Sequence, residues 1–218
     1  VCAAFSVRAA KTGMLFSPEI IETVADTLAR IADFPLVVDP VMVAGSGARL
    51  LQDEAITTLK QTLLPRAAVM TPNIPEAEIL LDGRIENTSD AAQAARDLAA
   101  RYGCAAVVKG GHRTVEPAVD FFSDGKLCWR LDTKQADPKA AHGTGCSLSA
   151  AFAACLARDA DPLDAMIRAK AYVFGSLTTA RRVGPNTWAM ASPKGLAENA
   201  VSCRLAGNSD TDEPRSGT

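Results

Sequence analysis

The chain has 218 residues, and a hydrophobic content of 48% is enough to bury a sizeable core in one α/β domain. Its formal net charge of -2, with charges dispersed along the sequence, provides no basic face, so nucleic acid and anionic membranes are not expected partners. The six cysteines are scattered without a Cys-x-x-Cys pair, which indicates reduced thiols in place of a disulfide framework or a zinc site. No signal peptide or bilayer-length apolar run is visible, and we therefore expect a cytoplasmic protein with a small-molecule partner.

Short apolar runs alternate with longer amphipathic segments along the first half of the chain. This pattern predicts βα units that build a mostly parallel central sheet with helices on both faces. The expected strands are Ala10–Met14, Leu36–Asp39, Ala67–Thr71 and Ala105–Lys109. The expected helices between them lie near Pro18–Ala32, Asp53–Leu63, Pro75–Leu81 and Ser89–Tyr102.

The pattern changes after residue 118. Val119–Phe122 and Lys126–Leu131 flank an Asp-Gly turn, which predicts a hairpin. Helices are then expected at Cys146–Arg158, at Pro162–Arg182 and from about Pro193, and Lys170 is interpreted as ordinary helix surface or core. We expect one domain over residues 1–206 and a disordered tail over 207–218, where Ser, Asp, Thr, Glu, Pro and Gly prevail.

The stretch from Ala141 to Ala151 joins a two-glycine turn to a helix of small residues. Glycine lets the backbone approach a ligand closely, and the first helical amides are unpaired donors at the positive end of the helix dipole. The turn therefore predicts an anion site made by Gly143, Thr144 and Gly145. Cys146 would lie in the first turn, where the dipole favours the thiolate, a base or nucleophile.

Polar residues end three of the expected strands, where open α/β sheets place their ligand sites. Asp39 leaves a buried apolar strand, Asn73 and Glu76 lie three residues apart at a helix start, and Lys109 precedes Gly110 and Gly111. An ammonium beside open backbone amides suits a phosphate.

Each of these residues also has a purely structural interpretation. Asp39 before a proline can cap a turn, and Glu76 can complement the helix dipole. Lys109 can be a solvent-exposed charge, and His142 is best interpreted as a loop hydrogen-bond donor. The sequence alone leaves these alternatives open.

Five stretches in this order resemble the ribokinase-like small-molecule kinases, and more closely the hydroxymethylpyrimidine/phosphomethylpyrimidine kinases of thiamine biosynthesis. They are Lys11-Thr12-Gly13-Met14-Leu15, Val38-Asp39-Pro40-Val41-Met42-Val43, Thr71-Pro72-Asn73-Ile74-Pro75-Glu76-Ala77, Val108-Lys109-Gly110-Gly111-His112 and His142-Gly143-Thr144-Gly145-Cys146-Ser147-Leu148-Ser149. The likeness implies a ribokinase-like three-layer sandwich. It also implies phosphorylation of 4-amino-5-hydroxymethyl-2-methylpyrimidine and of its monophosphate, with ATP and Mg²⁺ as cofactors.

The resemblance implies a role for each motif residue. Cys146 would be the general base or the group that positions the attacking oxygen, and the amides of Gly143, Thr144, Gly145 and Cys146 would hold the transferred phosphoryl group. Other roles are charge neutralisation by Lys109, ATP contact by Lys109, Gly110, Gly111, Thr144 and Gly145, magnesium binding by Asp39, Asn73 and Glu76, and substrate contact by Gly13, Met14 and Val41. A homodimer is also expected by resemblance alone.

The chain departs from this family at its start. Members usually open with a strand, a Gly-rich substrate loop and further βα units before the Lys-Thr-Gly-Met-Leu stretch, whereas this chain starts almost at that stretch. We therefore expect N-terminal strands to be missing, in a fragment or a recent truncation whose activity the sequence does not decide.

Three alternatives stay open. A pyridoxal kinase of the same superfamily would use nearly the same phosphate machinery on another ring that bears a hydroxymethyl group. A hydroxyethylthiazole kinase also has a Gly-Thr-Gly-Cys turn, but the Asn73 and Lys109 stretches favour the pyrimidine enzyme. A truncated, non-catalytic module that binds nucleotide or pyrimidine is the alternative of a different class.

Overall fold

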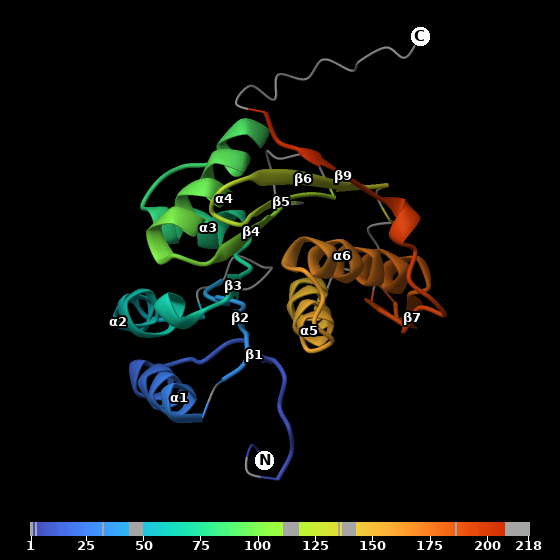
Figure 1. Ribbon diagram of the computed structural model, residues 1–218. Coiled ribbons are helices and arrows are strands. Elements are labelled where there is room, and N and C mark those ends of the chain that lie inside the picture. Colours follow the sequence, from blue (N-terminus) through green and yellow to red (C-terminus); the bar gives the residue numbers. More distant parts are fainter. Residues whose placement is uncertain are drawn as a thin grey trace.

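A seven-stranded sheet in the order β1-β2-β3-β4-β5-β6-β9 organises the part of the chain that the structure describes (Figure 1). This computed structural model describes residues 2, 4–31, 33–43, 50–110, 118–134, 136, 143–185 and 187–207. Strands β1 to β4 are parallel, and β5, β6 and β9 continue the sheet with antiparallel pairing. Their bounds are β1 Ala10–Thr12, β2 Leu36–Val38, β3 Val69–Met70, β4 Ala105–Lys109, β5 Val119–Ser123, β6 Cys128–Thr133 and β9 Val201–Leu205.

Helices cover both faces of this sheet (Figure 1). One face carries α1 (Pro18–Ile31), α2 (Asp53–Thr58), α3 (Ile74–Leu81) and α4 (Thr88–Tyr102). The other face carries α5 (Thr144–Leu156) and α6 (Pro162–Thr178). The predicted sandwich of helices around a sheet is thereby confirmed, with its parallel part in β1 to β4.

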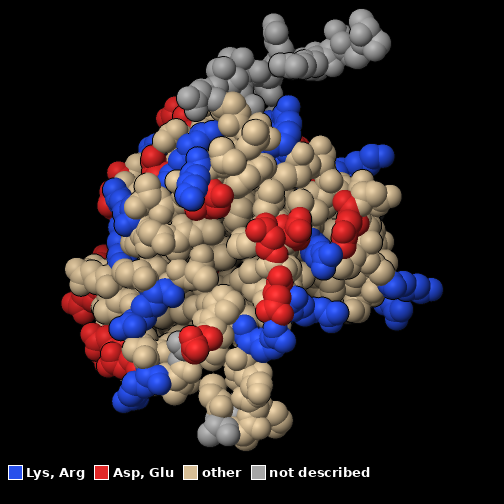
Figure 2. Space-filling model, in the orientation of Figure 1, with Lys and Arg blue, Asp and Glu red and all other residues tan. Residues whose placement is uncertain are grey.

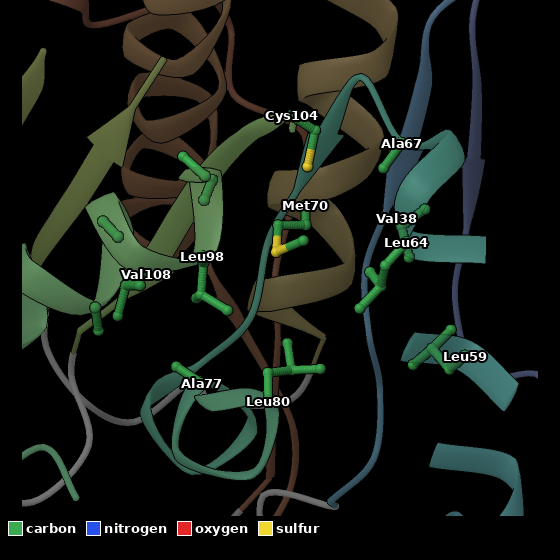
Figure 3. Close-up of a cluster of buried hydrophobic side chains, with 14 of the residues drawn as sticks. Val38, Leu59, Leu64, Ala67, Met70, Ala77, Leu80, Leu98, Cys104 and Val108 are labelled. Atoms are coloured by element: carbon green, nitrogen blue, oxygen red, sulfur yellow. The ribbon is translucent and has the colours of Figure 1, made fainter. Parts of the chain in front are cut away.

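Each face of the sheet has its own apolar core because side chains of a strand alternate between the two faces. Figure 3 shows part of the larger core, where Leu80 of α3 and Leu98 of α4 lie close to Met70 of β3. On the other face, Val107 of β4 and Phe152 of α5 belong to a second buried cluster. The carboxyl edge of the parallel strands lies between these two cores and receives loops from both.

Local sequence explains where two of the helices begin. Asn73 caps α3, and its side chain accepts a hydrogen bond from the Glu76 amide at 2.9 Å. Asn87 caps α4 in the same way, with the Asp90 amide as donor at 2.9 Å. Asx side chains at this position satisfy a helical N–H that has no partner in the helix.

The predicted helix Asp53–Leu63 begins as expected and then changes its winding. α2 ends at Thr58, a π-helical turn follows over Leu59–Leu63, and a 3₁₀ turn covers Leu64–Arg66. Pro65 lacks the amide hydrogen that a continuing α-helix needs, and it lies in the first positions of this 3₁₀ turn.

Two expectations for the C-terminal quarter are wrong. The helix from Pro162 ends at Thr178 instead of Arg182, and Arg181–Gly184 forms β7, which pairs with β8 (Thr187–Ala189). The hydroxyl of Thr179 donates to the Gly175 carbonyl, a local bond that competes with helix continuation.

No helix starts near Pro193 in the described residues; a 3₁₀ turn over Glu198–Ala200 leads into β9. The alternation of Val201 and Cys203, which pack on the second core, suits a strand better than a helix.

Acidic and basic side chains lie interspersed on the face of the molecule in Figure 2, as the dispersed charges of the sequence predict. Among the described residues, no helix combines the length and apolar character required to cross a membrane. Residues 208–218, where we expected a disordered tail, lie outside the described part of the chain.

Candidate active site

The carboxyl ends of β1 to β4 bring the sequence-predicted polar residues to one edge of the sheet, which we call the carboxyl edge. Backbone bonds fix their order: the Asp39 amide donates to the Thr12 carbonyl, and the Thr71 amide donates to the Val38 carbonyl. The Lys109 amide donates to the Pro72 carbonyl at 2.9 Å, and Asn73 and Lys109 form a parallel bridge. The candidate residues of three separate motifs are therefore neighbours.

Asp39 lies at the centre of this cluster and is only 1% exposed. Its Oδ1 accepts hydrogen bonds from Lys109 Nζ at 3.0 Å and from Thr71 Oγ1 at 3.2 Å. Its Oδ2 accepts a hydrogen bond from Ser149 Oγ at 3.1 Å. The Asp39 carboxylate therefore links the ends of β3 and β4 to α5, which is more than the capping of its own turn requires.

Lys109 is held between Asp39 and the glycine turn. Burial alone would lower the pKa of the Lys109 ammonium, but the carboxylates of Asp39 and Glu76 outweigh it and raise that pKa. Its Nζ also lies so close to Gly145 that a Cβ added there would stand 3.0 Å away. The cluster therefore favours the charged form of the Lys109 ammonium at the start of α5.

Asn73 and Glu76 form a capping box at the start of α3. While the Asn73 side chain accepts from the Glu76 amide, Glu76 Oε2 accepts from the Asn73 amide at 2.8 Å. Glu76 Oε1 reaches the Met42 amide at 3.2 Å in the loop after β2. Burial raises the pKa of Glu76 although Lys109 acts in the opposite direction, so the carboxylate would gain from a further cation.

The glycine turn begins α5 as the sequence predicts. Gly143 has φ 84° and ψ 4°, a left-handed conformation that favours glycine, and its carbonyl accepts from the Ser147 amide at 2.9 Å. No side chain among the described residues caps this helix start. Cys146 lies in the first turn and is exposed. The start of α5 thus combines amide donors, an accessible thiol and the nearby Lys109 ammonium.

The expected substrate residues follow the ends of β1 and β2. Met14 is 52% exposed, while Gly13 and Val41 are partly buried. Their location is at the carboxyl edge, and their contact with a substrate stays a prediction. Other predicted loop residues lie outside the described part of the chain, namely Gly111, His112, His142 and the turn 44–48.

Thr71 and Ser149 are site residues that the sequence reasoning did not single out. Both hydroxyls donate to the Asp39 carboxylate. Ser149 lies three residues after Cys146, and this spacing puts it one helical turn further along the same helix face. That spacing is a signal that could have identified it.

The oxygen ligands available for a metal are few. Within the described ranges, no group of three or more His, Cys, Asp and Glu side chains converges on one point. Two buried carboxylates, Asp39 and Glu76, and the Asn73 amide supply hard oxygen atoms, which suit Mg²⁺ better than softer metals. Mg²⁺ usually keeps several waters and few protein ligands, so this sparse set fits it.

Comparisons with a family model and with curated sequences point to the same protein family. A family model described as phosphomethylpyrimidine kinase matches residues 1–191. Hydroxymethylpyrimidine/phosphomethylpyrimidine kinase from Rhizobium meliloti (strain 1021) is 43% identical over 180 residues, or 81% of this chain and 66% of that protein. Four curated relatives at 38 to 43% identity are each matched over 66% or less of their own length. The chain thus spans at most about two thirds of these relatives.

Solved structures give the same fold. Pyridoxal kinase from Staphylococcus aureus in complex with AMP-PCP and pyridoxal matches with a TM-score of 0.79 at 27% identity, covering 94% of this chain and 76% of that one. Phosphomethylpyrimidine kinase from Clostridium difficile 630 matches with a TM-score of 0.68 at 34% identity, covering 76% of this chain and 67% of that one. The ribokinase-like fold expected from the motifs is confirmed.

Proposed function

Because the chain belongs to the phosphomethylpyrimidine kinase family, we propose that it contributes the phosphoryl-transfer site of a hydroxymethylpyrimidine/phosphomethylpyrimidine kinase. The reaction transfers the γ-phosphoryl group of ATP to the hydroxymethyl oxygen of 4-amino-5-hydroxymethyl-2-methylpyrimidine, and then to the resulting monophosphate. The observation that carries this proposal is the convergence of Asp39, Lys109 and the start of α5 at one edge of the sheet.

In the proposed chemistry, the thiolate of Cys146 accepts the proton of the substrate hydroxyl. The hydroxyl oxygen forms a bond to the γ-phosphorus, the bond from that phosphorus to the β-phosphate oxygen breaks, and ADP leaves. The hydroxyl proton passes to Cys146, which acts as general base. The amides of Gly143, Thr144, Gly145 and Cys146 stabilise the charge on the transferred group, and Lys109 neutralises charge on the phosphates.

Asp39, Asn73 and Glu76 are the residues that would hold magnesium in this proposal, directly or through water. Bound Mg²⁺ supplies charge neutralisation on the phosphates of ATP. Among the described residues, the buried pair of carboxylates faces the Lys109 ammonium, so these three groups carry excess negative charge when both acids are ionised. This excess supports a cation at the site.

The test is release of ADP by the chain with ATP and Mg²⁺, and with four acceptors offered separately. They are hydroxymethylpyrimidine, its monophosphate, pyridoxal and hydroxyethylthiazole. Turnover of the first two is expected. Absence of turnover on all four, with intact ATP binding, would contradict the proposed activity for this chain and favour a binding module.

Cys146→Ala tests the general base. A base acts mainly in the transition state, so this variant should reduce kcat far more than it weakens nucleotide binding. Cys155→Ala is a matched control on the same helix, because Cys155 packs on the second core away from the helix start. Equal losses of kcat and of ATP affinity in Cys146→Ala would reject the assigned role.

Pyridoxal is a second candidate acceptor because a pyridoxal kinase has the same fold at a TM-score of 0.79. Its sequence identity of 27% is lower than the 43% of the pyrimidine kinase relative, which favours the pyrimidine. Preferential turnover of pyridoxal in the four-acceptor assay would reverse this order.

We also propose one kinase domain over residues 1–206 and a cytoplasmic location, both from the composition of the sequence, and a homodimer, by family resemblance alone. Light scattering after size-exclusion chromatography tests the dimer. Fractionation of cells that express the natural protein tests the location.

A further inference from the structure

A buried ion pair lies next to the candidate site and takes no part in the chemistry proposed above. Lys170 of α6 is 5% exposed, and Asp120 of β5 is 8% exposed. Lys170 Nζ donates to Asp120 Oδ2 at 2.6 Å. The sequence analysis interpreted Lys170 as ordinary helix surface or core; the structure places it in the core and adds an ion pair that the sequence did not predict.

This pair reaches the phosphate side of the site through one backbone amide. Asp120 is paired with Lys109 across the antiparallel strands β4 and β5. Its second carboxylate oxygen, Oδ1, accepts a hydrogen bond from the Gly110 amide at 2.9 Å. Gly110 follows Lys109 directly, so the carboxylate fixes the backbone from which the Lys109 side chain extends.

Lys170 also holds the point where the chain enters β5. Its Nζ donates to the Ala118 carbonyl at 2.9 Å. Ala118 has φ 65°, a left-handed conformation that is uncommon for a residue with a Cβ. Since such a conformation persists only where its surroundings determine it, one ammonium stabilises both the exit from β4 at Gly110 and the entry into β5 at Ala118.

A contribution to folding stability does not by itself explain the buried ion pair between Lys170 and Asp120. Apolar replacement of a buried ion pair is often neutral or stabilising, because both charges lose their hydration in the folded state. A fixed geometry for the Lys109-Gly110 backbone is what an apolar pair would not supply.

We propose that Asp120 and Lys170 are positioning residues that orient the Lys109-Gly110 backbone for the phosphates of ATP. This inference rests on the proposed function in one respect, namely that Lys109 and Gly110 contact ATP. The pair itself acts through Gly110 and Lys109.

The experiment compares the affinity for ATP with the affinity for adenosine, which lacks phosphates. Lys170→Met should weaken ATP binding on the order of tenfold, as expected for a charge-assisted hydrogen bond, and leave adenosine binding unchanged. Arg130→Met is the matched control: Arg130 is 5% exposed and is paired with Asp132 on β6. It opposes Phe121 of the other core, so both affinities should stay at the wild-type values.

A double variant separates positioning from stability. Lys170→Met leaves Asp120 as a buried charge without its hydrogen-bonded cation, and adding Asp120→Val removes that charge. The double variant should recover part of the lost unfolding free energy but none of the lost ATP affinity. Recovery of ATP affinity together with stability would mean a merely structural pair and would overturn the proposal.

A milder variant decides the matter if the double variant does not fold. Asp120→Asn keeps an oxygen for the Gly110 amide and loses the charge that holds Lys170, so ATP affinity should fall less than in Lys170→Met. An unchanged ratio of ATP to adenosine affinity in Asp120→Asn and Lys170→Met would overturn the inference. If the wild type binds ATP more tightly than adenosine but turns over none of the four acceptors, the proposed function is contradicted and the positioning role of Asp120 and Lys170 is not.

Discussion

At the scale of single residues, Asp39 connects the parts of the site that come from different elements. One buried carboxylate accepts hydrogen bonds from Lys109, Thr71 and Ser149. Removal of one donor leaves a charge with fewer partners, and a buried charge without partners is costly. Small changes at this carboxylate should therefore affect the geometry of the whole cluster.

Gly145→Ala should reduce turnover without reducing stability. The new methyl group would lie 3.0 Å from Lys109 Nζ, the end of a flexible side chain that can move at low cost. Alanine also favours a helix over glycine by about 1 kcal/mol. Steady-state kinetics and urea unfolding measure the two effects.

Gly83→Ala is the control for that substitution, because a Cβ at Gly83 has its nearest neighbour at 4.0 Å. Its turnover should equal that of the wild type. Normal turnover in Gly145→Ala as well would show that the ammonium position next to Gly145 is unimportant.

Glu76→Gln should change the pH dependence of stability. Burial raises the native pKa of Glu76 above its ordinary value of 4.5, so the unfolded chain releases this proton first as pH rises. The unfolded state then binds fewer protons at this group, and the contribution of Glu76 to the unfolding free energy of the metal-free wild type falls with rising pH above 4.5. The variant lacks this contribution, so its stability relative to the wild type should increase over that range.

Urea unfolding of both proteins without metal, at pH values from 4.5 to 7.5, measures the difference. Parallel stability curves would be inconsistent with a raised pKa at Glu76.

At the scale of elements, predictions succeeded where a local pattern and a buried environment agreed. β4 has the predicted bounds Ala105–Lys109, and α4 begins one residue before the predicted Ser89. Prediction failed after Thr178, where β7 replaces the end of a helix and β9 pairs with distant β6. Pairing across more than 60 residues is not encoded in any local window, and this explains the failure of the helix predicted from Pro193.

Substitution of the two Asn caps should distinguish a residue that only stabilises a helix from one that also takes part in turnover. Asn87→Ala removes the α4 cap and should cost about 1 kcal/mol of stability with unchanged turnover. Asn73→Ala should cost a similar amount and should also reduce turnover, because Asn73 belongs to the proposed magnesium ligands. Unfolding measurements and kinetics on both variants test this, and equal turnover would remove Asn73 from the site.

At the scale of the whole molecule, the site lies between the two cores and depends on both. Asp39 follows a strand buried on both faces, and Ser149 comes from a helix of the second core. That the motif residues and the glycine turn meet at one edge was predictable from sequence, because parallel strands send their carboxyl ends to one edge. The exact strand ends were less so, since β1, β2 and β3 end one or two residues before the predicted positions. Thr71, Ser149 and Asp120 were not predicted, since their roles depend on contacts between elements far apart in the chain.

Ligand binding should stabilise the molecule as one unit. Free ATP with Mg²⁺ at about 100 times its Kd should add about 2.7 kcal/mol to the free energy of unfolding if only the folded state binds. Removal of the metal by EDTA should abolish most of this gain. Urea unfolding with and without EDTA measures it, and an equal gain in both conditions would argue against a metal-dependent site.

The reversal of direction between β4 and β5 has a consequence for how such domains evolve. In a fully parallel sheet, only the carboxyl ends of the strands lie at the ligand-binding edge, so each additional strand at that edge requires another crossover connection. Here β5 starts at the same edge where β4 stops, and Lys109 therefore stands opposite Asp120. If the proposed function holds, this reversal adds the start of β5 to the positions beside the phosphates, so that phosphate affinity can change by substitution at Asp120 while Cys146 and the glycine turn keep their sequence.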